Sequence, residues 1–530
     1  EEMRRAGLPL YALESGDPIR DFDIIAFSVG YEMAFPAMLN MLDLAGVPLH
    51  ASERTELTPL VIAGGTAMYN CEPIADFIDL ALIGEGEEMN AELIELHRRA
   101  RREGWTKQQF LRAAAQLDGI YVPGLYEVDY NADGTVKSIT PKDGAPKVVT
   151  KRIMRDMDKA WYPAKTIVPS TEIVQDRTTL ELFRGCIRGC RFCQAGYVYR
   201  PVRNRSEKLL RGYAVEAVED SGYQDMTLSS LSTSDYPHLV ELCDDLEDFC
   251  AQRHVTLALP SLRADNFSMA LMERLQKGRK TGLTFAPEAG TQRLRDAINK
   301  NLTEEDLLES CRRAFAGGYS AVKLYFMLGL PTETDEDVLG IADIAAHVMH
   351  AWRESALNKT RGVRITVSTS WFVPKPHTAF QWEPQIPIEE YERRVKLLRE
   401  AMNTKSVTYN WHPSPTSFME AVISCGDRRL GKVIETAWRK GETLSAWEDY
   451  FDLNRWMAAF EECGLDPHFY ANRRRSEDEI LPWSMISCGV APGYLKREHA
   501  LSYEGVTTPD CRTHCNACGA NCLVGGKCDV

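Results

Sequence analysis

The chain has 530 residues, of which 44% are apolar and 26% charged, and its formal net charge is −14. This length suggests roughly three to four domains, and the composition excludes a disordered, collagen-like or fibrous protein. The acidic balance argues against broad, nonspecific coating of nucleic acid. No apolar run approaches the roughly eighteen residues of a membrane span, and the charged first residues do not resemble a signal peptide. We therefore expect a cytoplasmic protein that does not contact a membrane.

Residues 1–101 alternate short apolar segments with helical patterns. Three segments are predicted strands: Asp23–Ser28, Pro59–Ile62 and Ile78–Ile83. Strands separated by helices predict a parallel sheet of the Rossmann type. Because three strands make a thin sheet and the chain lacks an initiator Met, we expect the natural sequence to continue before Glu1.

Residues 102–175 read as a linker that contains a hairpin around the polar turn 131–134. Residues 176–385 repeat a strand–helix unit about six times, which predicts a partial or full barrel with its active site at the carboxyl ends of the strands. Residues 386–480 look helical, with one candidate strand at Ser406–Trp411. Residues 481–530 form a tail rich in cysteine. The predicted barrel strands are Thr179–Phe183, Asp225–Leu228, Val255–Leu259, Gly282–Phe285, Ala321–Met327 and Arg364–Ser370.

Cysteine is the most informative residue type in this composition. Eight of the fifteen cysteines form two tight groups, which are Cys186, Cys190 and Cys193, and then Cys511, Cys515, Cys518, Cys522 and Cys528. The odd total, the tight spacing and the lack of a secretion signal favour metal or iron–sulfur binding over disulfides.

The first group has the pattern C-x3-C-x2-C directly after a predicted strand. Three thiolates cannot complete a four-coordinate zinc site, but they can hold three irons of a [4Fe–4S] cubane and leave the fourth open. An open coordination position on a metal is typical of a catalytic site rather than a structural one. A zinc loop, or three unrelated core cysteines, is the alternative interpretation.

This motif, with Phe192 as the aromatic residue before its last cysteine, resembles that of the radical S-adenosylmethionine (SAM) superfamily. The resemblance implies that Cys186, Cys190 and Cys193 are the catalytic cluster ligands. It also implies that SAM chelates the open iron, and that one electron cleaves the sulfonium to release a 5′-deoxyadenosyl radical. The fold class that follows is α/β, with a radical SAM partial (β/α)6 barrel.

Further motifs resemble the branch that contains cobalamin-linked enzymes and methylthiotransferases. They are 261–265 (SLRAD), 286–291 (APEAGT) and 329–334 (GLPTET), and Ala289 departs from the Ser that is frequent there. A strand-end carboxylate can accept hydrogen bonds from ribose or ammonium, and an arginine can pair with the SAM carboxylate. Each residue also has an ordinary structural interpretation. The candidate cofactor-binding residues of the barrel are Phe192, Ser229, Ser230, Arg263, Glu288, Arg293 and Gly329.

Ser28 after one strand, and Gly64 and Gly65 after the next, resemble parts of a cobalamin-binding motif. Residues 1–101 would then be a cobalamin-binding-like domain. The element that supplies a cobalt-ligating histidine would precede Glu1. A vestigial domain that binds no corrin is the alternative, and cobalamin stays uncertain.

The stretch 184–211 carries eight basic residues against Glu207 alone. It can be read as a solvated surface, as compensation for the negative cluster, as a docking site for an acidic electron donor such as flavodoxin or ferredoxin, or as a contact with RNA phosphate. We favour compensation together with donor docking.

The second cysteine group begins with the same spacing as the first, and Cys522 or Cys528 could give a fourth ligand. We favour a second [4Fe–4S] cluster over zinc, with zinc as the alternative. Most of the sequence, from residue 20 to about 385 and in the tail, thus resembles an uncharacterised radical SAM family with a cobalamin-binding-like N-terminal domain. This predicts a radical SAM enzyme that modifies an unidentified substrate, by preference RNA or protein, with methyl and sulfur transfer both open. The alternative is a non-catalytic iron–sulfur or zinc module with a redox or RNA-binding role.

Overall fold

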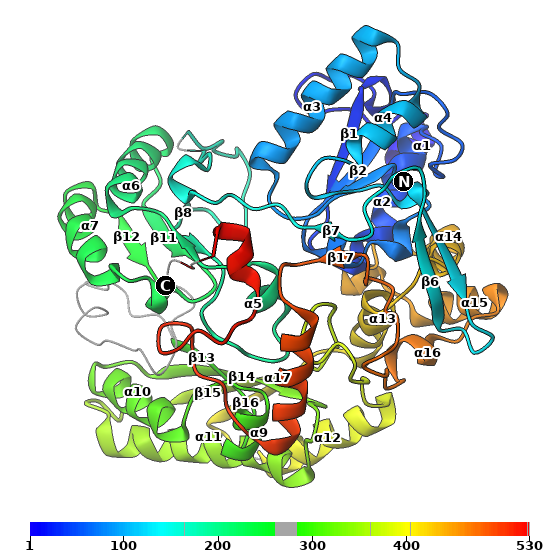
Figure 1. Cartoon of the computed structure of the whole chain (residues 1–530). Coiled ribbons are helices and arrows are strands. Elements are labelled where there is room, and N and C mark those ends of the chain that lie inside the picture. Colours follow the sequence, from blue (N-terminus) through cyan, green and yellow to red (C-terminus); the bar gives the residue numbers. More distant parts are fainter. Residues whose placement is uncertain (164, 260–282, 361, 403, 527, 529–530) are drawn as a thin grey trace. The chain divides into compact units, whose positions relative to one another are not determined.

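The computed structural model describes residues 1–163, 165–259, 283–360, 362–402, 404–526 and 528 (Figure 1). These residues form two compact units. Unit 1 comprises residues 1–154, 373–386 and 413–490, and unit 2 comprises residues 155–372, 387–412 and 491–530. Each unit is therefore assembled from three separate stretches of the chain.

Unit 1 contains a sheet of the predicted strands together with a fourth. Its strands lie in the order β1-β2-β3-β4, with β1, β2 and β3 parallel and β4 antiparallel at the edge. Strand β4 comes from the stretch that we expected to be a linker. The predicted hairpin is confirmed as β5 and β6. The strands of unit 1 are β1 (Ile24–Ser28), β2 (Leu60–Gly64), β3 (Leu80–Leu82), β4 (Ile120–Tyr121), β5 (Tyr126–Tyr130), β6 (Val136–Pro141), β7 (Val149–Thr150) and β17 (Ile486–Ser487).

Helices α2 and α3 follow the first and third strands of this sheet, as the alternating pattern predicts. Helix α4 begins with a capping box in which the Thr106 side chain accepts from the Gln109 backbone N–H. The helices of unit 1 are α1 (Glu2–Ala6), α2 (Phe35–Ala45), α3 (Gly86–Glu103), α4 (Lys107–Ala114), α13 (Ser414–Ser424), α14 (Leu430–Arg439), α15 (Leu453–Cys463) and α16 (Pro467–Ala471).

Unit 2 carries the parallel strands of the partial barrel. Among the described residues they follow chain order within two sheets, β8-β11-β12 and β13-β14-β15-β16. Strand β16, which lies in the stretch that we expected to be mainly helical, pairs with β15. The strands of unit 2 are β8 (Thr178–Glu181), β9 (Phe183–Arg184), β10 (Arg203–Asn204), β11 (Asp225–Ser229), β12 (Thr256–Ala258), β13 (Leu283–Glu288), β14 (Ala321–Leu328), β15 (Arg364–Trp371) and β16 (Val407–Trp411).

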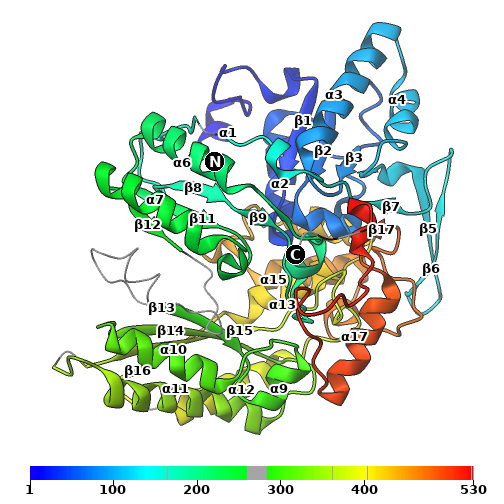
Figure 2. The same ribbon diagram turned by 60° about the vertical axis from the view of Figure 1, so that its left-hand side comes forward.

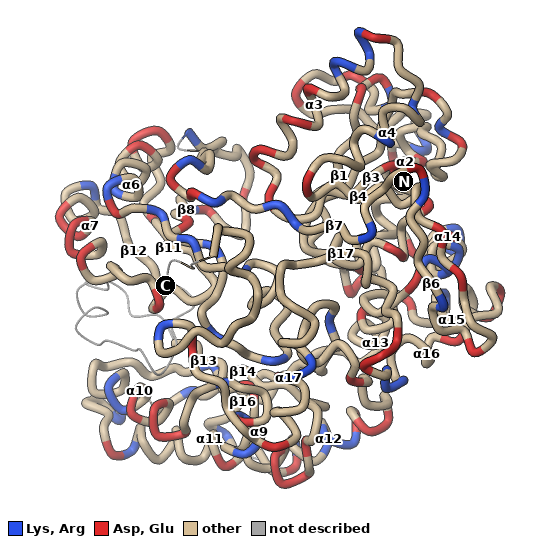
Figure 3. Tube along the Cα trace, viewed as in Figure 1, with Lys and Arg blue, Asp and Glu red and all other residues tan. Residues whose placement is uncertain are grey.

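The helices of unit 2 lie between these strands and after them. Figures 1 and 2 show α6 and α7 beside the sheet that contains β11, and α10 and α11 beside the sheet that contains β14. Figure 3 shows both basic and acidic residues on α6 and α10, whereas α7 carries mainly acidic residues. The helices are α5 (Gln194–Val198), α6 (Glu207–Ser221), α7 (Leu239–Arg253), α9 (Gln292–Ala297), α10 (Glu304–Ala316), α11 (Asp335–Ser355), α12 (Ile388–Ala401) and α17 (Pro492–Glu504), with a 3-10 turn η10 (Ala520–Val524) near the end.

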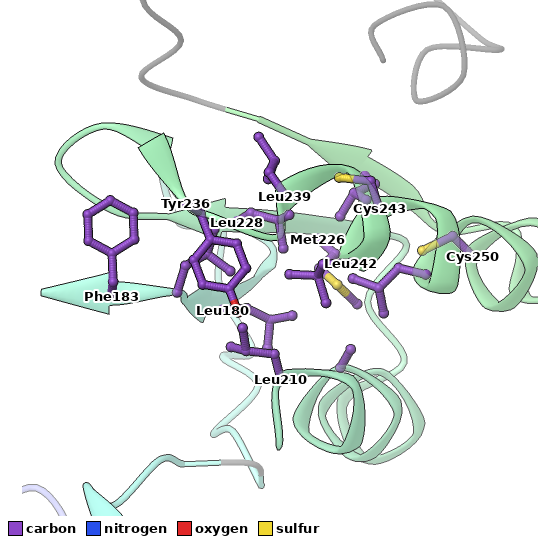
Figure 4. Close-up of a cluster of buried hydrophobic side chains, with 14 of the residues drawn as sticks. Leu180, Phe183, Leu210, Met226, Leu228, Tyr236, Leu239, Leu242, Cys243 and Cys250 are labelled. Carbon is purple, nitrogen blue, oxygen red and sulfur yellow. The ribbon is translucent and has the colours of Figure 1, made fainter. Parts of the chain in front are cut away.

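The core beside the first cysteine loop is apolar. Leu180 of β8 and Met226 and Leu228 of β11 pack against α6 and α7, as Figure 4 shows. Ile187 and, partly buried, Cys511 belong to the same cluster. Each Å² of apolar surface buried here stabilises the fold by about 25 cal/mol. This core therefore supports the loop that follows β9.

Candidate active site

The first cysteine loop leaves β9 (Phe183–Arg184) through Gly185. This glycine has a φ of +94°, and a Cβ there would lie 2.6 Å from the carbonyl oxygen of Pro201. Only glycine fits this close approach, so the loop turns back tightly on itself.

The three thiols of the loop affect one another. Burial and the nearby Cys190 raise the pKa of Cys186 to about 11. Burial, Cys190 and Cys186 raise the pKa of Cys193 to about 12, which Lys300 partly offsets. Shifts of this kind disfavour three free thiolates unless a cation binds them.

The donor set of the loop fits a cluster better than a single ion. Residues 186–193 offer three thiols and no other metal-ligating side chain. Among the described residues, no three His, Cys, Asp or Glu side chains are grouped so that they could hold a metal ion. A cubane does not require such convergence, because each thiolate binds a different iron. Three thiols without a fourth ligand in the loop are the donor set that a [4Fe–4S] cluster with one open iron would use.

Arginines of the predicted basic stretch are buried around this loop. Arg188 pairs with Asp235 at 2.6 Å, and Arg191 donates to the Ala297 carbonyl at 2.9 Å. Arg200 donates to the Gly196 carbonyl at 2.9 Å. All three side chains, with Arg203 and Arg205, are buried. These arginines therefore hold backbone and carboxylates rather than form a docking surface, which favours the interpretation of the stretch as internal compensation.

The carboxyl ends of β11 and β13 carry three of the predicted cofactor residues. Ser229 ends β11, and the Ser230 hydroxyl lies 3.1 Å from that of Thr233. Glu288 ends β13 after a register shift, has a φ of +71° and accepts from the Lys300 ammonium at 3.1 Å. A carboxylate held in the left-handed region costs energy and is typical of functional sites. Arg263 lies outside the described residues.

Gly329 and Arg293 lie near the end of β14, with different surroundings. The Gly329 N–H donates to Glu333 at 2.6 Å, and Arg394 also pairs with that carboxylate. Burial raises the pKa of Glu333 to about 7, although Arg394 and the Gly329 N–H lower it. Arg293 pairs with Asp337 and donates to the Thr332 carbonyl at 2.9 Å. The structure thus gives Arg293 a local partner, Asp337. Phe192, which lies between Cys190 and Cys193 in the sequence, is half-buried.

The predicted cobalamin residues of unit 1 lie at the carboxyl edge of its sheet. Ser28 ends β1 and is exposed. Gly65 has a φ of +107°, and a Cβ there would lie 2.4 Å from the Val29 carbonyl oxygen. The Val29 N–H donates to the Gly64 carbonyl at 2.7 Å. Contact between the two loops therefore explains Gly65 without a ligand, whereas a Cβ at Gly64 would only make ordinary contact with Leu82 at 3.8 Å.

Sequence reasoning missed Asn299 as a residue that holds the cysteine loop. It is fully buried, with a φ of +53°. Its amide donates to the Gly189 carbonyl at 3.0 Å and accepts from the Thr508 N–H at 2.8 Å. Asparagine is among the residues that tolerate left-handed φ, so the Asn299-Lys300-Asn301 sequence was the available signal.

Among the described residues, no helix is both long and apolar enough to cross a membrane.

Two family models match the chain. A model described as the radical SAM superfamily matches residues 180–345, and a model described as the N-terminal region of radical SAM proteins matches residues 1–123. The first match contains the cysteine loop and the residues at the ends of β11, β13 and β14. The second contains the sheet of unit 1.

Curated relatives and solved structures are similar at greater distance. An uncharacterised protein of Methanocaldococcus jannaschii is 28% identical over 471 residues, which is 88% of this chain and 91% of that protein. An uncharacterised methyltransferase of Pyrococcus horikoshii is 21% identical over 279 residues, 49% of this chain and 51% of that protein.

The solved structures include the radical S-adenosylmethionine methyltransferase TsrM from Kitasatospora setae, with a TM-score of 0.42 and 13% identity. The match covers 67% of this chain and 63% of TsrM, less than two thirds of that protein. They also include the cobalamin-dependent S-adenosylmethionine radical enzyme OxsB, with a TM-score of 0.43 and 10% identity, covering 91% of this chain and 70% of OxsB.

Proposed function

The chain belongs to the radical SAM superfamily and is a radical SAM enzyme, and we propose that it cleaves SAM reductively to modify a further substrate. The observation that carries the proposal is the thiol loop of Cys186, Cys190 and Cys193, which follows β9 at the carboxyl side of the parallel sheet. When bound there, a [4Fe–4S] cluster would supply the electron that splits SAM into methionine and a 5′-deoxyadenosyl radical. The chain's own residues hold the thiols and orient SAM.

We assign the positioning of SAM to residues at the strand ends. Glu288 offers a carboxylate to the ribose hydroxyls or the SAM ammonium, and Lys300 holds that carboxylate in place. Ser229 and Ser230 add hydroxyls, while Gly329 and Phe192 offer backbone and an aromatic face to the nucleoside. Arg263 and Arg293 are the candidates for the SAM carboxylate, and Arg293 would exchange its contact with Asp337 for SAM.

The substrate class and the electron donor belong to the same proposal. We favour RNA or protein as the substrate, because the helical and cysteine-rich parts offer surface beyond the barrel, and methyl or sulfur transfer as the reaction. An acidic one-electron donor of the flavodoxin or ferredoxin type would supply the electron in a reducing compartment such as the cytoplasm. We leave cobalamin out of the proposal, because a loop contact accounts for Gly65.

Anaerobic protein reconstituted with iron and sulfide, and then given SAM and dithionite, tests the proposal. We expect 5′-deoxyadenosine, and we expect Cys186→Ala to lose it while the protein stays folded. Cys243→Ala, a buried thiol of α7 outside both cysteine groups, is the matched control and should keep it. Iron without 5′-deoxyadenosine in the parent protein would instead support a non-catalytic redox or RNA-binding module.

A further inference from the structure

Arg200 follows the first cysteine loop in the sequence and lies against it in unit 2. The residue is only 3% exposed. Its Nη2 donates to the Arg188 carbonyl at 2.7 Å, and its Nε donates to the Gly196 carbonyl at 2.9 Å. The first carbonyl lies between the first two cysteines of the loop, and the second belongs to α5, which begins directly after the third. One guanidinium therefore joins the start of the cysteine loop to the helix that follows it.

Two glycines bring this guanidinium close to the thiols. A Cβ at Gly189, which directly precedes Cys190, would lie 3.9 Å from Nη2 of Arg200. A Cβ at Gly196, whose carbonyl the arginine holds, would lie 3.6 Å from Sγ of Cys193. Arg200 therefore lies beside residues that are next to two of the three thiols.

Two buried tyrosines fix the position of the guanidinium. Its Cζ lies 5.4 Å from the centre of the Tyr197 ring of α5 and 5.7 Å from that of the Tyr494 ring of α17. Both tyrosines are almost fully buried. A guanidinium is planar and weakly hydrated, so it can lie against aromatic rings while its edge donates to carbonyls, whereas the ammonium of a lysine lacks this fork of donors.

The cysteine-rich tail connects the loop to the helix that carries Tyr494. The Cys511 N–H donates to the Ile187 carbonyl of the loop at 3.2 Å. The Ala491 N–H, just before α17, donates to the Cys518 carbonyl at 2.8 Å. These backbone contacts keep α17, and with it the Tyr494 ring, attached to the loop. Binding of a second cluster by the tail cysteines stays a prediction from the sequence.

A buried positive charge at this place has a chemical consequence. A cluster gains one negative charge when it accepts an electron. A cation buried beside its ligands favours the reduced form, because little water is present there to screen the attraction. Net charge and hydrogen bonds around the sulfur ligands are among the factors that set the reduction potential of iron–sulfur clusters.

We propose that Arg200 is a positioning residue for the catalytic cluster: its hydrogen bonds close the cysteine loop, and its charge favours the one-electron reduction that precedes cleavage of SAM. This inference rests on the proposed function. The step transfers one electron from a reduced donor of the flavodoxin or ferredoxin type to the cluster, and Arg200 neither gains nor loses a proton or a bond.

Arg205 offers a matched control in the same basic stretch. It is buried, and it donates to the carbonyls of Met157 and Ala160 at 2.7 and 3.0 Å. Its Cζ lies 5.9 Å from the centre of the Tyr213 ring, and it pairs with Glu181 at 3.1 Å. Because both carbonyls lie outside the cysteine loop, loss of Arg205 should destabilise the fold without changing the reduction of the cluster.

Anaerobic redox titration of the full chain, followed by electron paramagnetic resonance, measures the effect of the charge. A SAM analogue that cannot be cleaved identifies the signal of the first site, since it binds only an iron with an open position. In Arg200→Gln we expect the equilibrium constant for reduction of this site to fall at least about tenfold, which is about 59 mV for one electron. Arg200→Lys keeps the charge and should stay within about threefold of the parent, as should Arg205→Gln.

Iron retention measures the effect of the hydrogen bonds. The iron held by Cys186→Ala is subtracted from that of each protein, so that only the first site is counted. After reconstitution and exposure to a chelator, we expect Arg200→Lys and Arg200→Gln to keep less than about half of the iron that the parent keeps there, because neither side chain has the donors to hold both carbonyls. Arg205→Gln should keep as much as the parent.

Each outcome decides a part of the proposal. An unchanged reduction equilibrium in Arg200→Gln would overturn the role of the charge, and full iron in both Arg200 variants would overturn the role of the hydrogen bonds. Equal effects of Arg200→Gln and Arg205→Gln would show that lost stability is the cause and would overturn both. The melting temperature of the iron-free protein shows whether each variant folds, and Arg200→Met replaces Arg200→Gln if that variant does not. Failure of the proposed function looks different, since the parent itself would then show no signal that responds to the SAM analogue and would form no 5′-deoxyadenosine.

Discussion

The carboxyl edges of the β1–β4 sheet in unit 1 and of the β13–β16 sheet in unit 2 are built from similar sequence signals but have different chemistry. In unit 1, Gly65 follows β2, and its neighbour is the backbone of Val29. In unit 2, Glu288 ends β13 with a left-handed φ, and its carboxylate meets Lys300. At the edge of unit 1, Gly65 allows two loops to contact each other. At the edge of unit 2, Glu288 holds a charged side chain on a strained backbone. The difference teaches that glycine after a strand is weak evidence for a ligand.

The buried charged side chains of the two units also differ in their surroundings. In unit 1, Lys375 lies between Glu32 and Glu420, at 3.0 and 2.9 Å, and Tyr31 donates to Glu420 at 2.9 Å. Burial alone would lower the pKa of Lys375, but the two carboxylates raise it above its usual value. Every charge there has a partner within the cluster. In unit 2 the buried charges surround the cysteine loop, where a cluster would add charge of its own.

The largest expected effect is the loss of stability when the ion pairs of unit 1 are broken. Lys375→Met leaves Glu32 and Glu420 buried without their cation, so we expect unit 1 to lose about 3 kcal/mol of unfolding free energy. Denaturant unfolding of the anaerobic protein measures it. The control is Lys432→Met on α14, an exposed lysine, which should change stability by less than about 0.5 kcal/mol. Equal stability of the two variants would show that the cluster is not structural.

The next effect tests the loop contact that explains Gly65. Gly65→Ala places a Cβ against the Val29 carbonyl at a φ of +107°, so we expect a loss of about 2 kcal/mol. Gly30→Ala is the matched change at the same edge, because a Cβ there meets nothing within 4 Å and the φ is not left-handed. Thermal unfolding compares them. If both variants were equally stable, the close approach would not be the reason for Gly65.

Much of the fold and part of the site could be predicted from the sequence. The strands of both units could be predicted from apolar segments with turn residues between them. The first loop could be identified because few other kinds of site use the cysteine spacing C-x3-C-x2-C. The partners of Arg188 and Arg191 could not be predicted, because Asp235 and Glu498 are far away in the sequence and are brought together only by packing. For the same reason the sequence could not show which arginines of the basic stretch are buried, as Arg188 and Arg191 are, and which are exposed, as Arg211 is. The candidate strand at Ser406–Trp411 is confirmed as β16, but its pairing with β15 could not be predicted.

An effect of intermediate size is expected on the pH dependence of stability, through Glu333 after β14 in unit 2. The carboxyl of Glu333 has its pKa raised to about 7 by burial, above the value of 4.5 that applies when unfolded. The folded state then binds more protons than the unfolded state between these values, so stability falls as pH rises from about 5 to 7. One unit of such a shift is worth about 1.4 kcal/mol. In Glu333→Gln we expect a flatter dependence of the melting temperature on pH, and an unchanged slope would assign the effect to another group.

A smaller and purely functional effect is expected at the end of β13. Glu288→Gln removes the negative charge but keeps the shape, so SAM should bind more weakly and 5′-deoxyadenosine formation should fall about tenfold. The melting temperature should change little, because the Glu288–Lys300 pair is partly exposed. Titration with SAM and product analysis measure the two. A large loss of stability with unchanged SAM binding would place Glu288 with the structural charges of unit 1 instead.

The smallest effect is expected at Ser28, and it tests the comparison most directly. Its side chain is exposed at the end of β1, where nothing but a bound ligand would require a hydroxyl. If the edge of unit 1 serves packing alone, Ser28→Ala should change stability by less than about 0.5 kcal/mol and leave 5′-deoxyadenosine formation unchanged. Protein reconstituted with hydroxocobalamin and desalted should then retain equally little corrin, by absorbance, in the parent and the variant. Stoichiometric corrin in the parent that is lost in Ser28→Ala would show that both edges bind cofactors, and that the glycines of unit 1 serve a ligand as well as the fold.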